Sequence, residues 1–187
     1  MEPREAQRII EALLFVSGHP LPLKRIVDVL QVEAAEVRRV VQALTSEYEQ
    51  AGHAFRIQEV AGGYRLATDE PLAPWIQRAL QQPKPDAVSA AALETLAIIT
   101  YRQPMTKADI EAIRGVDVTA SLETLIERRF VRIAGRKETP GRPFLYGTTA
   151  EFLRHFGLRS LDALPSLKVP VTKEPSTDEP AVATKTD

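Results

Sequence analysis

Basic and aromatic side chains are the residues of this sequence whose chemistry is most evident, and most of them lie in its second half. Arginine and lysine recur between residues 128 and 142, where their charges could contact phosphate groups. These basic residues are Arg128, Arg129, Arg132, Arg136, Lys137 and Arg142. The large aromatic residues Trp75, Tyr101, Phe144, Tyr146, Phe152 and Phe156 are more than two small cores need. We expect most of them in the core, with one or two at the surface to anchor a partner helix or strand.

Catalytic, cofactor and metal chemistry has no matching pattern in the sequence. The chain has no cysteine, which excludes disulfides, thiolate nucleophiles and cysteine-type zinc sites. Its histidines, His19, His53 and His155, are far apart, and none has a second ligand type at metal spacing. Phosphate-binding glycine loops and the G-x-S-x-G nucleophile motif are absent. Carboxylates such as Glu127 alternate with basic residues such as Arg128, as on a solvated helix face. We therefore predict no enzyme, no cofactor and no metal.

Length and composition favour a protein of one medium domain or two small ones. The chain has 187 residues, of which 44% are hydrophobic and 26% charged, as in soluble globular proteins. No apolar run approaches the roughly 20 residues that a membrane helix needs. The N-terminus carries charges where a secretory signal has its apolar segment. We therefore expect a cytoplasmic protein with no membrane contact.

The first half of the chain has three predicted helices followed by a hairpin. Apolar spacing predicts helices over residues 6–17 and 23–30. The third helix has one clear apolar stripe, formed by Val37, Val40, Val41, Leu44 and Tyr48. The period then changes to that of two strands, residues 55–60 and 64–66, with Gly62 and Gly63 predicted to form the turn between them. A further helix, residues 72–80, carries Trp75. This order predicts a winged-helix domain.

The second half repeats this order. Ser89 is predicted to cap a helix that ends near Tyr101 and has Leu93, Leu96, Ala97 and Thr100 on one face. Thr106 caps a second helix, residues 107–114, which Gly115 ends, and Asp117 or Thr119 opens a third. Strands are predicted at residues 131–133 and 144–147, with a charged loop at 135–142, and Thr149 caps a last helix. Pro20 and Pro104, and Ile26 and Ile110, are each 84 residues apart. The repeat predicts tandem units.

The predicted fold class is therefore mainly α with small β-wings (α+β). We expect an N-terminal winged-helix domain at residues 1–82, a linker at 83–88 and a C-terminal winged-helix domain at 89–165. Residues 166–187 are rich in Pro, Ser, Thr and charge, which predicts a disordered tail that serves as a solubilising extension.

Winged helices often bind DNA, so a tandem winged-helix transcription regulator is an alternative. Such a regulator places its third helix in the major groove. Arg38 and Arg39 lie early on that helix in the first unit, but the second unit offers Asp117, Ser121 and Glu123, and acids there would repel phosphate. Residues 1–82 carry two more acidic than basic residues, and residues 88–164 two more basic than acidic. We expect at most weak, nonspecific DNA contact.

The sequence resembles the bacterial segregation and condensation protein B family over roughly residues 5–165. The matching pieces are TYRQPMTKADIEAIRGV (100–116), GRPFLYGTTAEFLRHFGL (141–158), LDALP (161–165), AQRIIEALLFVSGHPL (6–21) and GGYRLAT (62–68). The spacing between the pieces also fits the family. The resemblance implies a non-enzymatic subunit of the bacterial structural-maintenance-of-chromosomes (SMC) complex, active in chromosome condensation and partition in the cytoplasm at the nucleoid.

The resemblance also implies partners. Family members form homodimers through the first winged-helix domain. The second domain grips the kleisin subunit, segregation and condensation protein A (ScpA), and through it the SMC ATPase. For the kleisin groove we expect Tyr101, Arg142, Tyr146 and Phe152. For the dimer surface we expect Arg8, Glu11 and Phe15, which lie off the core stripe of the first helix.

Overall fold

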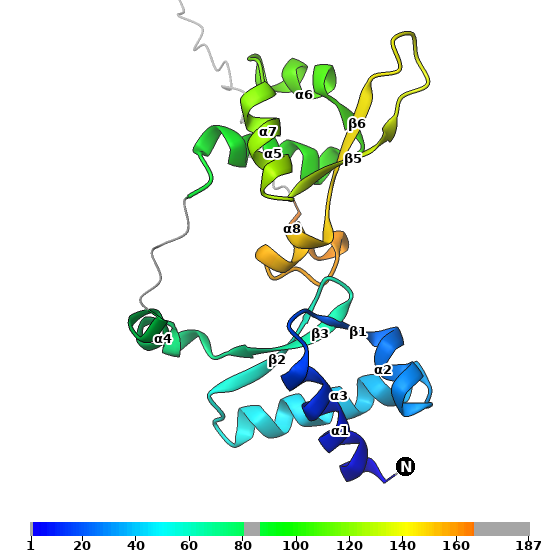
Figure 1. Cartoon of the computed structure of the whole chain (residues 1–187), viewed down its shortest axis with the longest axis vertical. Coiled ribbons are helices and arrows are strands. Elements are labelled where there is room, and N and C mark those ends of the chain that lie inside the picture. The colour runs from blue at the N-terminus through cyan, green and yellow to red at the C-terminus, as the bar shows by residue number, and fades with distance from the viewer. Residues whose placement is uncertain (1, 81–86, 167–187) are drawn as a thin grey trace, which may run out of the picture.

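The computed structural model describes residues 2–80 and 87–166 and shows a mixed α+β protein built from two units (Figure 1). Residues 2–80 are called the N-terminal unit and residues 87–166 the C-terminal unit. Each unit places three helices against a three-stranded antiparallel sheet and adds a short helix after the sheet. Among the residues so described, none of the helices combines the length and apolar character that crossing a bilayer requires.

The N-terminal unit contains the helices and hairpin that the sequence predicts. Its elements are α1 (Pro3–Val16), β1 (Leu21–Pro22), α2 (Leu23–Leu30), α3 (Ala34–Gln50), β2 (Phe55–Val60), β3 (Gly63–Thr68), the 3-10 turn η1 (Glu70–Leu72) and α4 (Ala73–Leu80). The predicted stripe of α3, from Val37 to Tyr48, is buried in full. It packs with Ile10 and Leu14 of α1 and Ile26 of α2 into one hydrophobic core. The apolar residues that the helical spacing places on the inward face of α3 are therefore the ones that the structure buries.

The β2–β3 hairpin turns one residue earlier than the sequence predicts. Ala61 and Gly62 form the turn, with φ of 51° and 73°, as a type I′ hairpin turn requires. Gly63, which the sequence assigns to the turn, instead begins β3 and pairs with Pro22 of β1. A Cβ atom on Gly63 would lie 2.5 Å from the carbonyl oxygen of Leu21. Glycine is therefore needed at position 63 because β1 approaches closely, and not because the chain turns there.

The C-terminal unit repeats the arrangement. Its elements are α5 (Ala90–Arg102), β4 (Met105–Thr106), α6 (Lys107–Arg114), α7 (Thr119–Glu127), β5 (Val131–Arg136), β6 (Phe144–Thr148), α8 (Ala150–His155) and the 3-10 turn η2 (Leu161–Ala163). The predicted caps are confirmed, because Ser89, Thr106 and Thr149 each accept a backbone N–H at the start of their helix. Gly115 ends α6 with a φ of 71°, which glycine adopts without steric cost.

The internal repeat predicted from the sequence is visible in the fold. Helix α6 (Lys107–Arg114) begins and ends 84 residues after α2 (Leu23–Leu30). Ile26 and Ile110, at equivalent positions of these helices, are both fully buried. The two sheets have equivalent strand orders, β1-β3-β2 and β4-β6-β5. Each unit has its own hydrophobic core, because the two clusters of buried residues have no residue in common.

The two units touch through the tip of the β2–β3 hairpin. The backbone N–H groups of Ala61 and Gly62 donate to the carbonyl oxygens of Leu158 and Arg159, at 2.9 and 3.0 Å. Figure 1 shows this tip reaching the segment after α8. The predicted linker, residues 83–88, lies largely outside the described residues, and the predicted tail, residues 166–187, lies outside them except for Ser166.

Candidate partner-binding groove

An apolar groove lies on the C-terminal unit between α5, α8 and residues 157–165, which are called the closing segment. Its volume is about 280 Å³. It is lined by Leu93, Leu96, Ala97, Thr100, Tyr101, Phe152, Phe156, Leu158, Leu164 and Pro165. No charged side chain is among them, so the groove suits apolar side chains of a partner.

Helix α5 forms one wall with a row of side chains that the sequence places on one face. Leu93, Leu96, Ala97 and Thr100 do share a face, and this face borders the groove. The residues that α5 buries most deeply in the core are Ala92, Thr95, Leu96, Ile99 and Thr100. Leu93 is 43% exposed. The helix therefore has two neighbouring apolar faces, one against the core and one open to the groove.

Helix α8 supplies the floor and the opposite rim. The Thr149 hydroxyl accepts the N–H of Phe152 at 3.2 Å and so sets the start of the helix. Phe152 is 4% exposed, whereas Phe156, one turn later, is 44% exposed. The centroids of the two rings are 4.9 Å apart. Phe152 thus belongs to both the core and the groove floor, and Phe156 offers a ring edge at the rim.

The closing segment completes the groove and is held at both ends. The Leu158 N–H donates to the Leu153 carbonyl at 2.9 Å, just after Gly157 takes a φ of 66°. At the other end, the Tyr101 hydroxyl donates to the Pro165 carbonyl at 2.9 Å. Leu158 and Leu164 pack against the core of the unit. This part of the wall is therefore made by a segment without helix or strand over most of its length.

Thr100 places a buried hydroxyl beside the groove. Its side chain is 6% exposed, and within the described part of the chain its Oγ1 atom is buried and has no hydrogen-bond partner. A buried hydroxyl without a partner costs roughly 1–3 kcal/mol. This oxygen therefore lowers the stability of the unit, and because it is itself buried it offers no polar group to the open groove.

The groove brings together two of the four residues predicted to contact a partner. Tyr101 and Phe152 both line it. Tyr146 lies on β6, pairs with Met105 and Ile133, and packs against the core of the unit. Arg142 is exposed in the β5–β6 loop with a φ of 38°. The sequence reasoning did not assign Phe156, Leu158, Leu164 and Pro165 to the groove, although it names Phe156 among the aromatic residues that could anchor a partner.

More aromatic side chains reach the surface than the sequence analysis expects. Trp75 is 66% exposed, Phe156 44%, Phe144 40% and Tyr101 38%. Four of the six therefore lie outside the core, where the sequence analysis expects one or two. Phe144 is covered in part by Arg136, whose guanidinium lies 4.2 Å from the ring centroid.

The predicted dimer residues lie on α1 but differ in their surroundings. Arg8 is exposed and Phe15 is 82% exposed, next to Val16 at 75%. Glu11 is instead engaged within the unit, because it accepts a hydrogen bond from the Tyr48 hydroxyl. Burial, together with this bond, raises the pKa of Tyr48 well above its usual range. The free apolar surface of α1 is therefore at its C-terminal end.

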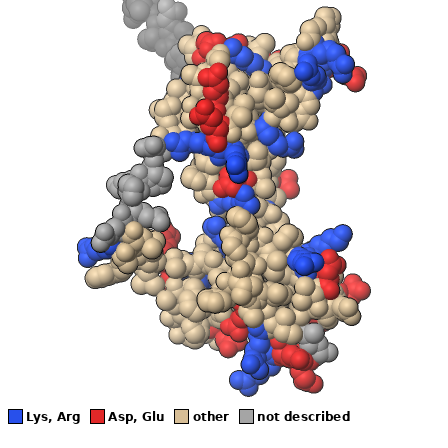
Figure 2. Space-filling model, viewed as in Figure 1, with Lys and Arg blue, Asp and Glu red and all other residues tan. Residues whose placement is uncertain are grey.

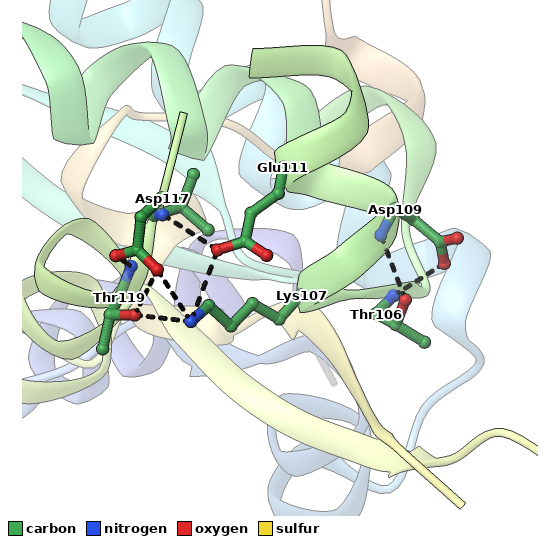
Figure 3. A network of polar contacts seen from close by, with 7 residues as sticks. Thr106, Lys107, Asp109, Glu111, Asp117 and Thr119 are labelled. Atoms are coloured by element: carbon green, nitrogen blue, oxygen red, sulfur yellow. Dashed lines mark hydrogen bonds and ion pairs between the residues drawn. The ribbon is translucent and has the colours of Figure 1, made fainter. Parts of the chain in front are cut away.

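A polar network occupies the turn between α6 and α7 (Figure 3). Lys107 Nζ lies 3.0 Å from Asp117 Oδ2 and 3.3 Å from Glu111 Oε1. A hydrogen bond from the Thr119 amide, and then the bond from Lys107, hold the pKa of Asp117 well below its usual range. The bond to Asp117 likewise raises the pKa of Lys107. Because acids surround Lys107, the start of α7 is poorly suited to phosphate.

Basic side chains gather instead at the tip of the β5–β6 hairpin (Figure 2). Arg136, Lys137 and Arg142 lie in or beside this loop, together with Glu138. Lys137 Nζ is 3.6 Å from Asp109 Oδ2. The tip is basic but small, and it lies on a different element from the start of α7.

Within residues 2–80 and 87–166, no group of three or more His, Asp or Glu side chains could hold a metal ion.

A family model and several relatives match most of the chain. Residues 8–167 match the family model described as segregation and condensation complex subunit ScpB. Segregation and condensation protein B of Symbiobacterium thermophilum is 52% identical over 167 residues, which are 89% of this chain and 75% of the relative. The crystal structure of ScpB from Mycobacterium tuberculosis is 29% identical, with a TM-score of 0.42 over 84% of this chain and 98% of that chain. A dimer of a ScpB N-terminal domain complexed with ScpA peptide is 31% identical, with a TM-score of 0.39 over 41% and 95%.

The fold and the groove define an α+β protein of two repeated units, one of which has an apolar surface groove. The family model covers most of the chain, and relatives of 40–52% identity span most of it. The chain belongs to the family of subunit ScpB of the segregation and condensation complex.

Proposed function

We propose that this protein is a non-enzymatic subunit of a bacterial SMC–kleisin complex and that it binds the kleisin ScpA through the groove of its C-terminal unit. It thereby supports chromosome condensation and segregation in the cytoplasm at the nucleoid. The family to which the chain belongs supports the complex, and the geometry of α5, α8 and the closing segment supports the site.

The observation that carries the proposal is an apolar groove with exposed apolar side chains at its rim. Leu93 and Phe156 offer exposed apolar surface at the rim, with 43% and 44% of each side chain accessible. An amphipathic kleisin segment would bury these rim side chains with its apolar face. Tyr101 and Phe152 then act as wall and floor, whereas Arg142 and Tyr146 lie elsewhere on the unit.

Both units are winged-helix domains in this proposal, at residues 1–82 and 89–165, joined by a linker at 83–88 and followed by a tail at 166–187. Helices α1–α3 with the β2–β3 hairpin, and α5–α7 with the β5–β6 hairpin, have the order that this domain type requires. The N-terminal unit forms the homodimer, with Arg8 and Phe15 of α1 at its surface. A dimer presents two grooves, which raises the effective concentration of the kleisin and of the SMC ATPase that it bridges.

A tandem winged-helix transcription regulator is the second candidate, and the basic tip of the β5–β6 hairpin favours it. Arg142 and Arg136 are exposed there. The start of α7, which such a regulator would place in the major groove, carries Asp117 and a lysine engaged by acids. We therefore assign the hairpin at most weak, sequence-blind contact with DNA.

Two measurements separate the candidates. Affinity purification of the full chain from its source cells should recover the kleisin encoded in the same genome. A DNA titration should show similar, salt-sensitive affinity for all sequences. A regulator would instead prefer one site over random DNA by about 10³ or more. Recovery of no kleisin together with such a preference would overturn the proposed function.

A further inference from the structure

Helix α4 lies outside the core of the unit to which it belongs. None of its residues, from Ala73 to Leu80, is buried. It follows η1 directly and has its main contacts there, and Figure 1 shows it extending away from α1, α2 and α3. An isolated helix shorter than about 12–15 residues is marginal in water. Because α4 has only 8 residues, it needs a surface to pack against.

The side chains of α4 show which kind of surface this is. Trp75, Ile76, Ala79 and Leu80 follow the i, i+1, i+4, i+5 spacing of one apolar stripe. Trp75 is 66% exposed and Leu80 is 58% exposed. Arg78 lies over the Trp75 ring, with 5.2 Å between the guanidinium carbon and the ring centroid. An exposed tryptophan beside an arginine is a typical anchor of a protein–protein interface.

A second exposed apolar patch lies on the same unit, at the end of α1. Phe15 and Val16 end α1 and are the two most exposed large hydrophobic side chains of the described chain, at 82% and 75%. Helices α1 and α4 are separate in Figure 1, and the main contacts of α4 do not include α1. One copy therefore displays two apolar patches that do not contact each other. A contact between them in a dimer with a two-fold axis would form twice.

We propose that α4 of one copy packs its Trp75 stripe against Phe15 and Val16 of a second copy, and that the second copy does the same in return. This inference rests on the proposed homodimer and specifies its geometry. It assigns α4, which the sequence analysis treats only as the end of the first domain, to the dimer interface. It also explains why the one tryptophan of the chain sits on a helix without a core.

The single tryptophan makes the proposal directly measurable. Indole emission shifts to shorter wavelength when the ring leaves water, and all tryptophan emission of the full chain comes from Trp75. We expect emission typical of an exposed indole in dilute solution. As concentration rises, the emission should shift to the blue in step with the dimer fraction measured by sedimentation equilibrium.

Side-chain truncations test the contact itself. Trp75→Ala and Phe15→Ala should each weaken dimerisation by at least about 30-fold, as for a central interface anchor. The double variant should be little weaker than either single variant, because both remove the same contact. Gln77→Ala is the matched control on α4 and should leave the dimer constant within about threefold. All three substituted positions are exposed, and circular dichroism checks that each of the four variants keeps its fold.

Each other outcome is decisive. A dimer in which Trp75 emission stays that of an exposed indole would overturn the docking of α4 but leave the homodimer in place. Absence of a dimer at any concentration would overturn both. Blue-shifted emission in the monomer would show α4 docked on its own chain, and additive losses in the double variant would show that Phe15 and Trp75 contact different surfaces. Either result would refute the exchanged contact.

Discussion

The hydroxyl of Tyr101 on α5 donates to the carbonyl oxygen of Pro165 at 2.9 Å, across 64 residues of sequence. This bond fastens the far end of the closing segment to the helix that forms the opposite wall of the groove. It joins an exposed side chain to a backbone oxygen, so its net contribution is of the order of 1 kcal/mol. The width of the groove therefore depends on a bond that one substitution removes.

Tyr101→Phe should weaken kleisin binding by about threefold to tenfold, because the end of the closing segment loses its hydrogen bond to α5. The ring remains, so the apolar wall is kept. Isothermal titration of the full chain with the central segment of the kleisin measures the change. Faster hydrogen exchange of residues 158–165 in the free variant should accompany it. Weaker binding with unchanged exchange there would show that Tyr101 acts by direct contact and not through the segment.

Thr100→Val separates stability from binding at the groove wall. The substitution keeps the shape of the side chain and removes a buried hydroxyl that has no partner among the described residues. We expect the free protein to gain about 1 kcal/mol of stability, because the cost of an unsatisfied buried group disappears. Kleisin affinity should stay within about threefold, because the hydroxyl oxygen is buried and the shape of the wall is kept. Urea unfolding and isothermal titration measure the two quantities, and a loss of stability would show that the hydroxyl has a partner in the folded protein.

Arg142→Ala should reduce any binding to duplex DNA without affecting the kleisin. Arg142 is exposed at the hairpin tip and is not among the residues that line the groove. The slope of log affinity against log salt should fall by about 1 for each lost phosphate contact. Fluorescence anisotropy with two unrelated duplexes measures the slope. A loss confined to one of the two sequences would indicate base recognition and would favour the regulator.

The N-terminal unit should lose stability in alkaline solution. Burial and the hydrogen bond to Glu11 raise the pKa of Tyr48, while an unfolded chain releases this proton near pH 10. The unfolded state therefore binds fewer protons above about pH 10, so the stabilisation is complete below that pH and is lost as the pH rises further. The urea midpoint between pH 7 and pH 11 measures this loss. Tyr48→Phe should flatten the alkaline decline, and an equally steep decline in that variant would assign it to another group.

Local features of the fold could be predicted from the sequence, because they depend on neighbours along the chain. A helix cap such as Ser89, Thr106 or Thr149 can be predicted because it involves only one hydroxyl and the backbone of the next helical turn. The buried stripe of α3 can be predicted because it follows from the spacing of apolar residues along one helix. The hairpin was placed correctly but its turn was shifted, because the role of Gly63 is set by Leu21 of β1, more than 40 residues away in sequence, and no local pattern records that approach.

The full lining of the groove could not be predicted, because three segments that are separate in the sequence form it. Leu93 and Ala97 lie on α5 with the same spacing that core residues have. This spacing alone does not distinguish a helix face that packs in the core from an apolar face that stays open. Phe156 and Leu164 are ordinary apolar residues until packing brings them to α5. The same limit applies to Trp75. Its apolar character suggests burial, whereas the structure leaves it on a helix with no core to enter.

The most direct test that the kleisin binds in this groove compares two substitutions that each introduce a glutamate, one in the groove and one outside it. Leu93 at the groove rim and Ile126 on α7 are 43% and 40% exposed, so they are matched in exposure, and circular dichroism checks that each glutamate variant folds. Isothermal titration of the full chain with the central kleisin segment should show that Leu93→Glu weakens binding by at least about tenfold, because a carboxylate must be desolvated in an apolar groove. Ile126→Glu should bind within about threefold of the unmodified protein. Unchanged binding by a folded Leu93→Glu variant, or a loss confined to Ile126→Glu, would contradict the assignment of the kleisin to this groove.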